Sequence, residues 1–150
     1  GYYDCYFSLA NTEERAKYLD FTSVPLHTTK YGLFALNKDK LLTDDLSNTP
    51  IAMLRGVAVP EVIAKKYKLD ENNLLRSLST KDTFELLEKN RVEYAITNYQ
   101  AGLWYSKEYQ NVYARQFNEF TFPTYIAFKR SVIDTKLVDE QIKRFKAQTQ

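Results

Sequence analysis

The fold is indicated by one stretch near the start of the chain, Asp4-Cys5-Tyr6-Phe7-Ser8-Leu9-Ala10-Asn11-Thr12-Glu13-Glu14-Arg15-Ala16-Lys17-Tyr18-Leu19-Asp20-Phe21-Thr22. Apolar residues end in a polar corner, which predicts a strand over residues 2–9 and a short helix over residues 12–19. Thr12 is expected to cap this helix, so that Arg15 occupies its third position. Open α/β sheets bind small anions where a strand end meets a helix start. The stretch therefore predicts an α/β fold with a candidate binding site near Arg15.

The composition predicts a globular protein and argues against several classes of function. The 150 residues suffice for one domain or two small lobes, with 44% hydrophobic and 27% charged residues. The 21 Lys and Arg nearly balance the 19 Asp and Glu, so the net charge of +2 gives no reason to expect nucleic acid or a membrane surface as a partner. No apolar run approaches the roughly 20 residues that a membrane span needs. Cys5 is the single cysteine, which excludes an internal disulfide and a Cys-based metal site.

Beyond this stretch, the apolar pattern predicts alternating strands and helices. Strands are expected at residues 31–36, 50–54, 74–78, 94–97, 112–117 and 125–128, and helices at 58–68, 80–90, 99–107 and from 134 onward. A helical turn is expected near residues 44–46, and Pro60 as the first residue of its helix. The expected buried helix faces are Val62, Ile63 and Tyr67, then Phe84 and Leu87, then Val138, Ile142 and Phe145. The alternation implies βαβ units in a parallel sheet.

Two crossings marked by prolines, near Thr28–Lys30 and Pro123–Thr124, are expected to divide the chain into two lobes. Residues 29–124 form a self-contained α/β lobe, and residues 1–28 meet residues 125–150 in the other lobe. A chain that leaves a lobe and returns to it makes a two-segment hinge.

The residues that usually carry catalysis are not arranged for it. The four glycines form neither a G-x-G-x-x-G motif nor a P-loop. His27 is the only histidine, and no serine stands in a nucleophile-elbow context, so a structural role is expected for it. Glu13 and Glu14 are adjacent in a helix and point to different faces, and Asp44-Asp45 lies in a polar loop. We therefore expect no enzyme activity.

Three strand ends carry groups suited to a small ligand. Arg15 is either a clamp for a carboxylate or the partner of Asp20 in a salt bridge. Arg55-Gly56-Val57-Ala58 either presents free N–H groups to an anion at a helix start or is an ordinary turn. Asn98-Tyr99 either contacts the ligand or caps a helix.

Taken in order, these strand ends resemble the extracellular solute-binding proteins of family 3, the polar-amino-acid type of periplasmic binding protein. The resemblance covers essentially the whole chain and is carried by Thr12-Glu13-Glu14-Arg15, Asp20-Phe21-Thr22, Tyr31–Leu36, Asp45-Leu46 with Ile51–Gly56, Val92–Asn98 and Tyr125–Lys129. It implies an α/β fold of the periplasmic binding protein type II kind, in which two lobes close over a ligand like a hinged trap.

The resemblance also implies which residues bind the ligand. Arg15 matches the arginine that binds the ligand carboxylate, and Ala10 matches a strand-end position that lines the site. Val57 and Ala58 match a pair that supplies N–H groups to the same carboxylate. The candidate ligand-binding residues are Ser8, Ala10, Arg15, Gly56, Val57, Ala58 and Asn98.

Two departures from the family pattern bear on the ligand. Val57 and Ala58 lack the hydroxyl groups usual at their positions, so only their backbone can contribute. Asn98 stands where amino-acid binders keep an aspartate, and an amide cannot supply the negative charge that pairs with an ammonium group. An organic acid or another polar solute with a carboxylate therefore fits better than an α-amino acid.

A third departure concerns the front of the fold. The family begins with a strand, helix, strand and helix that complete lobe one. This sequence begins later in the family pattern, at the strand before the arginine. Lobe one is then incomplete, with a sheet edge and an apolar face exposed. We expect the chain to be a fragment of a longer protein, or the gap to be filled by another chain or a second copy.

The resemblance implies a non-enzymatic solute-binding protein of the bacterial periplasm that delivers a small polar ligand to the permease of an ABC transporter, without a cofactor or metal. The chain starts at Gly1 without a signal peptide, so we expect a mature or trimmed product. Two alternatives stay open. One is the ligand-sensing periplasmic domain of a membrane receptor, such as a sensor kinase or cyclase, and the other is the non-catalytic lobe of a cell-wall enzyme, such as a peptidoglycan lyase.

Overall fold

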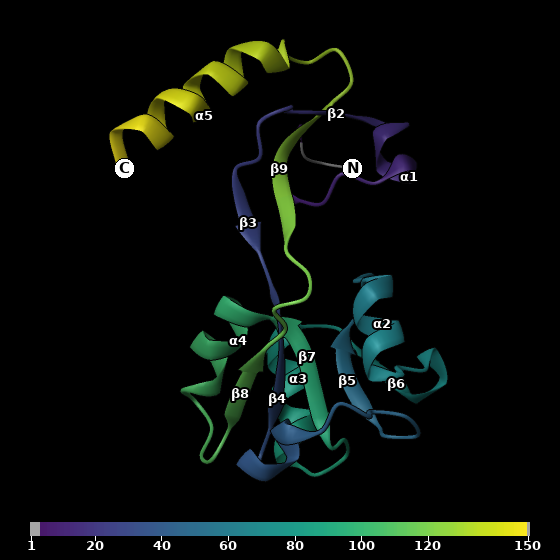
Figure 1. Ribbon diagram of the computed structural model, residues 1–150. Coiled ribbons are helices and arrows are strands. Elements are labelled where there is room, and N and C mark those ends of the chain that lie inside the picture. Colours follow the sequence, from purple (N-terminus) through teal and green to yellow (C-terminus); the bar gives the residue numbers. More distant parts are fainter. Residues whose placement is uncertain (1–3, 150) are drawn as a thin grey trace. The chain divides into compact units, whose positions relative to one another are not determined.

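The computed structural model describes residues 4–149, so the start of the strand expected at residues 2–9 lies outside the described residues. The chain divides into two compact units (Figure 1). Unit 1 comprises the described residues up to Thr29 and from Phe122 onward, and unit 2 comprises Lys30–Thr121. The chain passes from one unit to the other twice, close to the two positions marked by prolines.

Unit 2 is built on a five-stranded sheet in the order β6-β5-β7-β4-β8. Its strands are β4 (Tyr31–Ala35), β5 (Ile51–Leu54), β6 (Leu74–Ser77), β7 (Tyr94–Asn98) and β8 (Tyr113–Gln116). β5 pairs in parallel with β6 and β7, whereas β4 pairs antiparallel with both β7 and β8. The expected parallel sheet is therefore mixed, because β4 runs against the other four strands. The link from β4 to β5 carries the 3₁₀ helix η1 (Lys38–Leu42).

Three helices pack on this sheet, α2 (Glu61–Tyr67), α3 (Thr80–Glu88) and α4 (Tyr99–Ser106), and a second 3₁₀ helix, η2 (Glu71–Asn73), precedes β6. Pro60 caps α2 instead of forming its first residue. Ile63 and Tyr67 are buried as expected, but Val62 is 43% exposed because it lies about 100° round the helix from Ile63. The turn expected near residues 44–46 is not helical, and the Asp45 carboxylate there accepts the Ser47 N–H at 3.0 Å.

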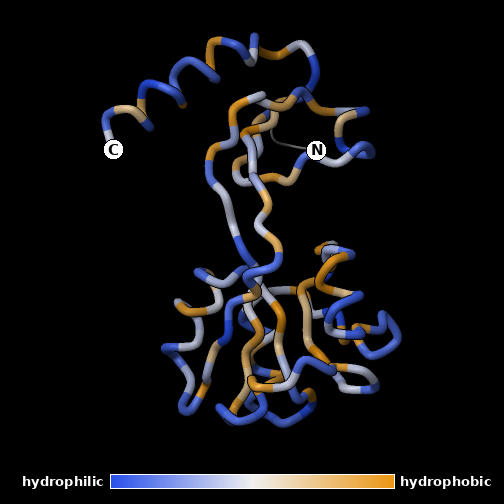
Figure 2. The backbone as a smooth tube through the Cα atoms, in the orientation of Figure 1, coloured by the Kyte–Doolittle hydropathy of each residue, from blue (hydrophilic) through white to orange (hydrophobic). Residues whose placement is uncertain are grey.

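The core of unit 2 lies where α3 and α4 meet the sheet. Phe34 of β4 is fully buried and contacts Phe84 of α3 edge-on, with 5.2 Å between ring centroids. Leu87 is buried beside them, as the helical spacing predicts. Figure 2 shows hydrophobic residues concentrated along the central strands of this unit.

Unit 1 is organised around β9 (Phe122–Lys129), a longer strand than the one expected at residues 125–128. It pairs antiparallel with β1 (Cys5–Leu9), β2 (Leu19–Phe21) and β3 (His27–Thr29). Pro123 lies within β9, opposite Thr28 of β3 and beyond the register of β1. A proline is tolerated there because its missing N–H faces the unpaired side of the strand.

Two helices belong to unit 1, α1 (Glu13–Ala16) and α5 (Thr135–Thr149). Thr12 caps α1 as expected, accepting the Arg15 N–H at 3.3 Å, and the helix is shorter than expected because β2 begins at Leu19. Asp134 accepts the Lys136 N–H at 3.0 Å at the start of α5. Ile142 is buried, whereas Phe145 is 64% exposed and does not belong to the buried face. Among the residues described, no helix has the length and apolar character to cross a membrane.

Candidate functional site

Four candidate residues gather at one edge of the sheet of unit 2. β5 and β7 run in parallel, so Gly56, Val57 and Ala58 after β5 and Asn98 at the end of β7 lie at the same side (Figure 1). We name this side the carboxyl edge. It is where β5, β6, β7 and β8 end and where the antiparallel β4 begins. Open α/β sheets bind ligands at this side of their strands.

Tyr31 connects the turn after β5 with the end of β7, and it was not among the residues expected at the carboxyl edge. It pairs with Asn98 in the register of β4 and β7, and its hydroxyl group donates to the Ala58 carbonyl at 3.3 Å. The side chain is only 7% exposed, so it holds the turn after β5 against β7. The sequence shows Tyr31 at the start of an apolar run, but no local signal reveals the antiparallel register that brings it to this edge.

The turn after β5 is fixed by backbone conformation and by Arg76. Gly56 has a positive φ of 78°, a conformation that glycine adopts without strain. The Val57 N–H donates to the Leu54 carbonyl at 3.3 Å, and Arg76 Nη1 donates to the Val57 carbonyl at 2.7 Å. A pair of hydrogen bonds of 2.8 and 2.7 Å ties the same guanidinium to Glu71.

The position of this turn corrects one expectation. α2 begins only at Glu61, so Val57 and Ala58 precede the helix and are not its first residues. The Val57 N–H closes the turn and is not free for an anion. Within residues 4–149, the Ala58 N–H donates to no protein acceptor.

Asn98 is the cap of α4. Its side-chain oxygen accepts the Ala101 N–H at 3.0 Å, which is the structural role that asparagine commonly plays at a helix start. The cap orients the amide at the carboxyl edge, beside the residue that pairs with it, Tyr31.

The other three candidates lie in unit 1, at the corner between β1 and α1. Arg15 is half-buried, and its Nη1 donates to the Ala10 carbonyl at 3.1 Å. No ion pair of Arg15 occurs within residues 4–149, and Asp20 instead accepts the Ser131 N–H at 3.0 Å. Of the two roles considered for Arg15, the salt bridge with Asp20 is not formed. The guanidinium is held in place by a neutral carbonyl and keeps further donors for an anion.

Ser8 has an unusual backbone conformation for its position. Its φ is 56°, and the register of β1 against β9 shifts between Tyr6 and Leu9. The Ser8 hydroxyl group is 3.3 Å from Nε2 of His27, so the single histidine contacts β1 from β3. This histidine is exposed and has no acidic hydrogen-bond partner in the described part of the chain.

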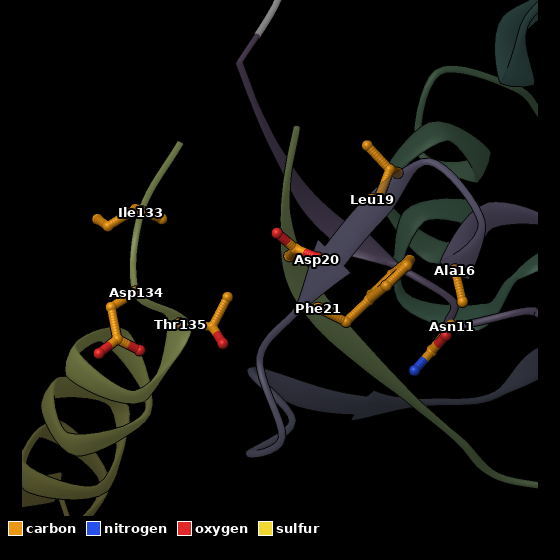
Figure 3. Close-up of a pocket in the computed structure, with 8 residues that line it drawn as sticks. All are labelled: Asn11, Ala16, Leu19, Asp20, Phe21, Ile133, Asp134 and Thr135. Carbon is orange, nitrogen blue, oxygen red and sulfur yellow. The ribbon is translucent and has the colours of Figure 1, made fainter. Parts of the chain in front are cut away.

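A pocket of about 380 Å³ lies in unit 1, between β2 and the start of α5 (Figure 3). It is lined by Asn11, Ala16, Leu19, Asp20, Phe21, Ile133, Asp134 and Thr135. Its lining contains two carboxylates, which accept backbone N–H groups of Ser131 and Lys136, and no cationic side chain. The pocket lining therefore has no positive charge to pair with a carboxylate, and it contains none of the candidate residues.

The structure also bears on metals. Among residues 4–149 no three His, Cys, Asp or Glu side chains come together in a way that could hold a metal ion.

Solved structures of known proteins are similar to this chain in fold, whereas comparison of its sequence finds no match. No family model and no curated protein matches this chain. The solved amino-acid ABC transporter substrate-binding protein AbpA from Streptococcus pneumoniae, bound to L-arginine, is similar with a TM-score of 0.75 and 21% identity, over 95% of this chain and 61% of that one. Holo ArgBP from T. maritima is similar with a TM-score of 0.79 and 15% identity, over 97% of this chain and 65% of that one. The ligand-binding core of GluR0 in complex with L-glutamate is similar with a TM-score of 0.75 and 17% identity, over 91% of this chain and 63% of that one.

These likenesses establish the fold. The chain has the mixed α/β fold of the periplasmic binding protein type II kind, and the expected fold class is confirmed. It spans less than two thirds of the length of each of the three structures. The structures that share its fold are named as binding proteins for transport or as a receptor's ligand-binding core.

Proposed function

We propose that this chain is a solute-binding protein of the bacterial periplasm that captures a small polar solute with a carboxylate for an ABC transporter. The observation that carries the proposal is the Arg15 guanidinium, which is held at a strand-to-helix corner by the neutral Ala10 carbonyl and has no acidic partner within residues 4–149. A guanidinium in this state binds a carboxylate with two hydrogen bonds. The fold supports the proposal, since substrate-binding proteins of amino-acid transporters share it.

The carboxyl edge of unit 2 contributes the other ligand-binding residues that we propose. Gly56 and Ala58 present backbone polar groups to the ligand, and Val57 lines the turn between them. Asn98 presents its side-chain amide. An amide carries no negative charge, so the edge lacks the group that would pair with the ammonium of an α-amino acid. We therefore propose an organic acid or a similar polar solute as the ligand.

A thermal-shift screen tests this proposal. Amino acids, dicarboxylates and polyols are added to the protein, and a bound ligand raises the melting temperature by mass action. Arg15→Ala is expected to weaken the binding of the stabilising ligand by about tenfold to a hundredfold, because a charge-assisted pair is lost. Arg15→Lys keeps the charge without the two-pronged geometry and is expected to bind at an intermediate level.

The matched control is Arg130→Ala, because Arg130 also belongs to unit 1 and also donates to a backbone carbonyl, that of Ala16 at 2.8 Å. This variant is expected to bind like the parent protein. Equal ligand affinity in Arg15→Ala and the parent protein would contradict the assignment of Arg15, and the absence of any stabilising solute would contradict the proposed function itself.

A ligand-sensing domain of a membrane receptor is the second candidate function, and the likeness to the GluR0 ligand-binding core favours it. Both functions predict solute binding through the same residues. The complete coding sequence of the gene separates them, because a receptor requires a membrane span in the same polypeptide and a free binding protein does not.

A further inference from the structure

Arg76 of β6 connects the turn after β5 to the 3₁₀ helix η2. Its Nη1 donates to the Val57 carbonyl at 2.7 Å and to the Leu54 carbonyl at 3.4 Å, so it spans both ends of the turn. The register that pairs Arg76 with Met53 brings this side chain to the turn. Its Nη2 donates to both carboxylate oxygens of Glu71, at 2.8 and 2.7 Å. The guanidinium is therefore held by a carboxylate and itself holds a backbone carbonyl.

This contact fixes the direction of the next backbone N–H group. The peptide between Val57 and Ala58 is planar and trans, so its carbonyl and its N–H point in opposite directions. Because Arg76 holds the carbonyl, the Ala58 N–H points away from the guanidinium. The Tyr31 hydroxyl group holds the following carbonyl, that of Ala58, at 3.3 Å. Ala58 is exposed and its N–H has no acceptor among the residues described, so a ligand can reach it.

Arg76 also makes the Ala58 N–H a stronger donor. A charged donor forms a stronger hydrogen bond with a carbonyl oxygen than a neutral donor does. Hydrogen bonds in series polarise one another, so electron density drawn toward the Val57 oxygen leaves the N–H of the same peptide more positive. The Glu71 carboxylate balances the charge of the guanidinium. The arrangement therefore supplies a directed N–H group for an anion, and it does not act through a net positive charge.

We propose that Arg76 is a positioning residue for an acidic group of the solute, because it holds the Val57 carbonyl so that the Ala58 N–H donates to a carboxylate. This inference rests on the proposed function for the acidic ligand, and every residue that it uses lies in unit 2. It does not depend on the start of α2, which begins later, at Glu61. The direction of a backbone donor in the turn is thus set by an arginine outside the candidate residues.

Nuclear magnetic resonance of the whole isotope-labelled chain tests this inference. The probes are acetate and succinate, with acetamide and succinamide as neutral counterparts, at an ionic strength held constant with sodium chloride. Both carboxylates are expected to move the Ala58 amide proton downfield, because a hydrogen bond to an anion deshields the proton. The neutral probes are expected to move it less, since they form weaker hydrogen bonds.

Two variants of Arg76 assign the effect to its side chain. Arg76→Met removes the donors and keeps the apolar stem, and it is expected to weaken acetate binding at Ala58 by about threefold to tenfold. In the same variant without a probe, the Val57 carbonyl carbon signal is expected to move upfield, a local change that a general loss of stability does not produce. Arg76→Lys keeps a charged donor without the fork of the guanidinium and is expected to restore part of both signals.

Arg115→Met is the matched control. Arg115 also donates to a backbone carbonyl, that of Thr43 at 2.8 Å, and to a carboxylate, that of Asp44 at 3.1 Å. Its side chain is 27% exposed, against 28% for Arg76. Thr43 follows η1, in a loop that carries none of the candidate residues. This variant is therefore expected to bind acetate like the parent protein.

Each outcome bears on a different claim. A shift of the Ala58 amide that weakens in Arg76→Met and persists in Arg115→Met supports the inference. Unchanged acetate affinity in Arg76→Met, or an equal loss in Arg115→Met, overturns the role of Arg76. A carboxylate that moves the Arg15 side-chain signal but not the Ala58 amide overturns the inference while the proposed function stands. A shift of neither signal contradicts both the inference and the acidic ligand of the proposed function.

Discussion

Gly102 of α4 lies directly against the ring of Phe34, at the place where α4 approaches the sheet of unit 2. A β-carbon at Gly102 would be 2.2 Å from Cζ of Phe34 and 2.5 Å from Cε2. These distances are far inside van der Waals contact, and Phe34 is fully buried and cannot swing away. The close approach of helix and sheet therefore depends on the absence of a side chain at this position.

Gly102→Ala is expected to destabilise unit 2. At an ordinary helix position the same change stabilises by roughly 0.5–1 kcal/mol, because alanine restricts the unfolded chain. Here the clash with Phe34 dominates, and we expect a net loss of about 1–3 kcal/mol. Urea unfolding followed by the fluorescence of Trp104, the single tryptophan and a residue of the same helix, measures the effect.

The control for this prediction is the double variant Gly102→Ala with Phe34→Leu. A smaller side chain at position 34 makes room for the new methyl group, so the two changes are expected to cost less together than their sum. An increase in stability in Gly102→Ala alone would show that α4 does not pack this closely on β4.

At the same scale, local signals predicted some site residues and not others. The Thr12 cap and the helical position of Arg15 follow from residues three apart in the sequence, and the structure confirms both. Tyr31 reaches Ala58 only through the register of β4 with β7, which joins residues far apart in the chain. No pattern in a single sequence encodes that register, so Tyr31 could not be predicted.

At the scale of elements, α5 is joined to the rest of unit 1 through Asp139. This side chain is 6% exposed and accepts hydrogen bonds from the Val24 N–H at 2.8 Å, the Ser23 hydroxyl group at 2.7 Å and the Ser23 N–H at 3.2 Å. Burial by itself would raise the pKa of Asp139, but these hydrogen bonds outweigh it and lower the pKa below the ordinary value of 3.8. The ionised carboxylate thus holds the segment after β2 against the helix.

The lowered pKa predicts how stability depends on pH. A group whose pKa is depressed by folding stabilises the protein above its unfolded pKa, and this contribution is lost as pH falls through the folded value. Asp139→Asn is expected to cost about 1–3 kcal/mol at neutral pH, because the amide cannot accept all three donors. Below about pH 4 the parent protein loses this advantage, so the two unfolding curves should approach each other.

Urea unfolding followed by circular dichroism at a series of pH values measures both effects. Glu140→Gln is the matched control, since Glu140 is the exposed neighbour of Asp139 on α5. It is expected to leave the pH dependence unchanged. Parallel pH profiles for the parent protein and Asp139→Asn would refute the role given to this carboxylate.

The sequence predicted which segments are strands and which are helices better than it predicted the direction of a strand or the buried face of a helix. The apolar runs predicted β4 to β8 because each strand has its own local pattern, whereas the antiparallel direction of β4 depends on its neighbours in space. Val62 and Phe145 satisfy helical spacing but are exposed, because the sheet determines which part of an apolar stripe is covered. Pattern alone does not supply that information.

At the scale of the whole molecule, the buried core is distributed unequally. Among the described residues, 18 buried hydrophobic side chains belong to unit 2, and three, Ile126, Ala127 and Ile142, belong to unit 1. Unit 2 is also one continuous segment, and its two ends leave from the same edge, since the start of β4 pairs with the end of β8. Burial of apolar surface is the main favourable term in folding, so unit 2 has the means to fold without unit 1.

We therefore predict that a protein consisting of residues 30–121 alone folds and unfolds cooperatively. Its urea unfolding, followed by Trp104 fluorescence, is expected to give a midpoint close to that of the same signal in the whole chain. Gly102→Ala should lower both midpoints by the same amount, because the contact with Phe34 lies entirely within this segment. A fragment without a cooperative transition, or one in which Gly102→Ala has no effect, would mean that the core of unit 2 depends on residues of unit 1.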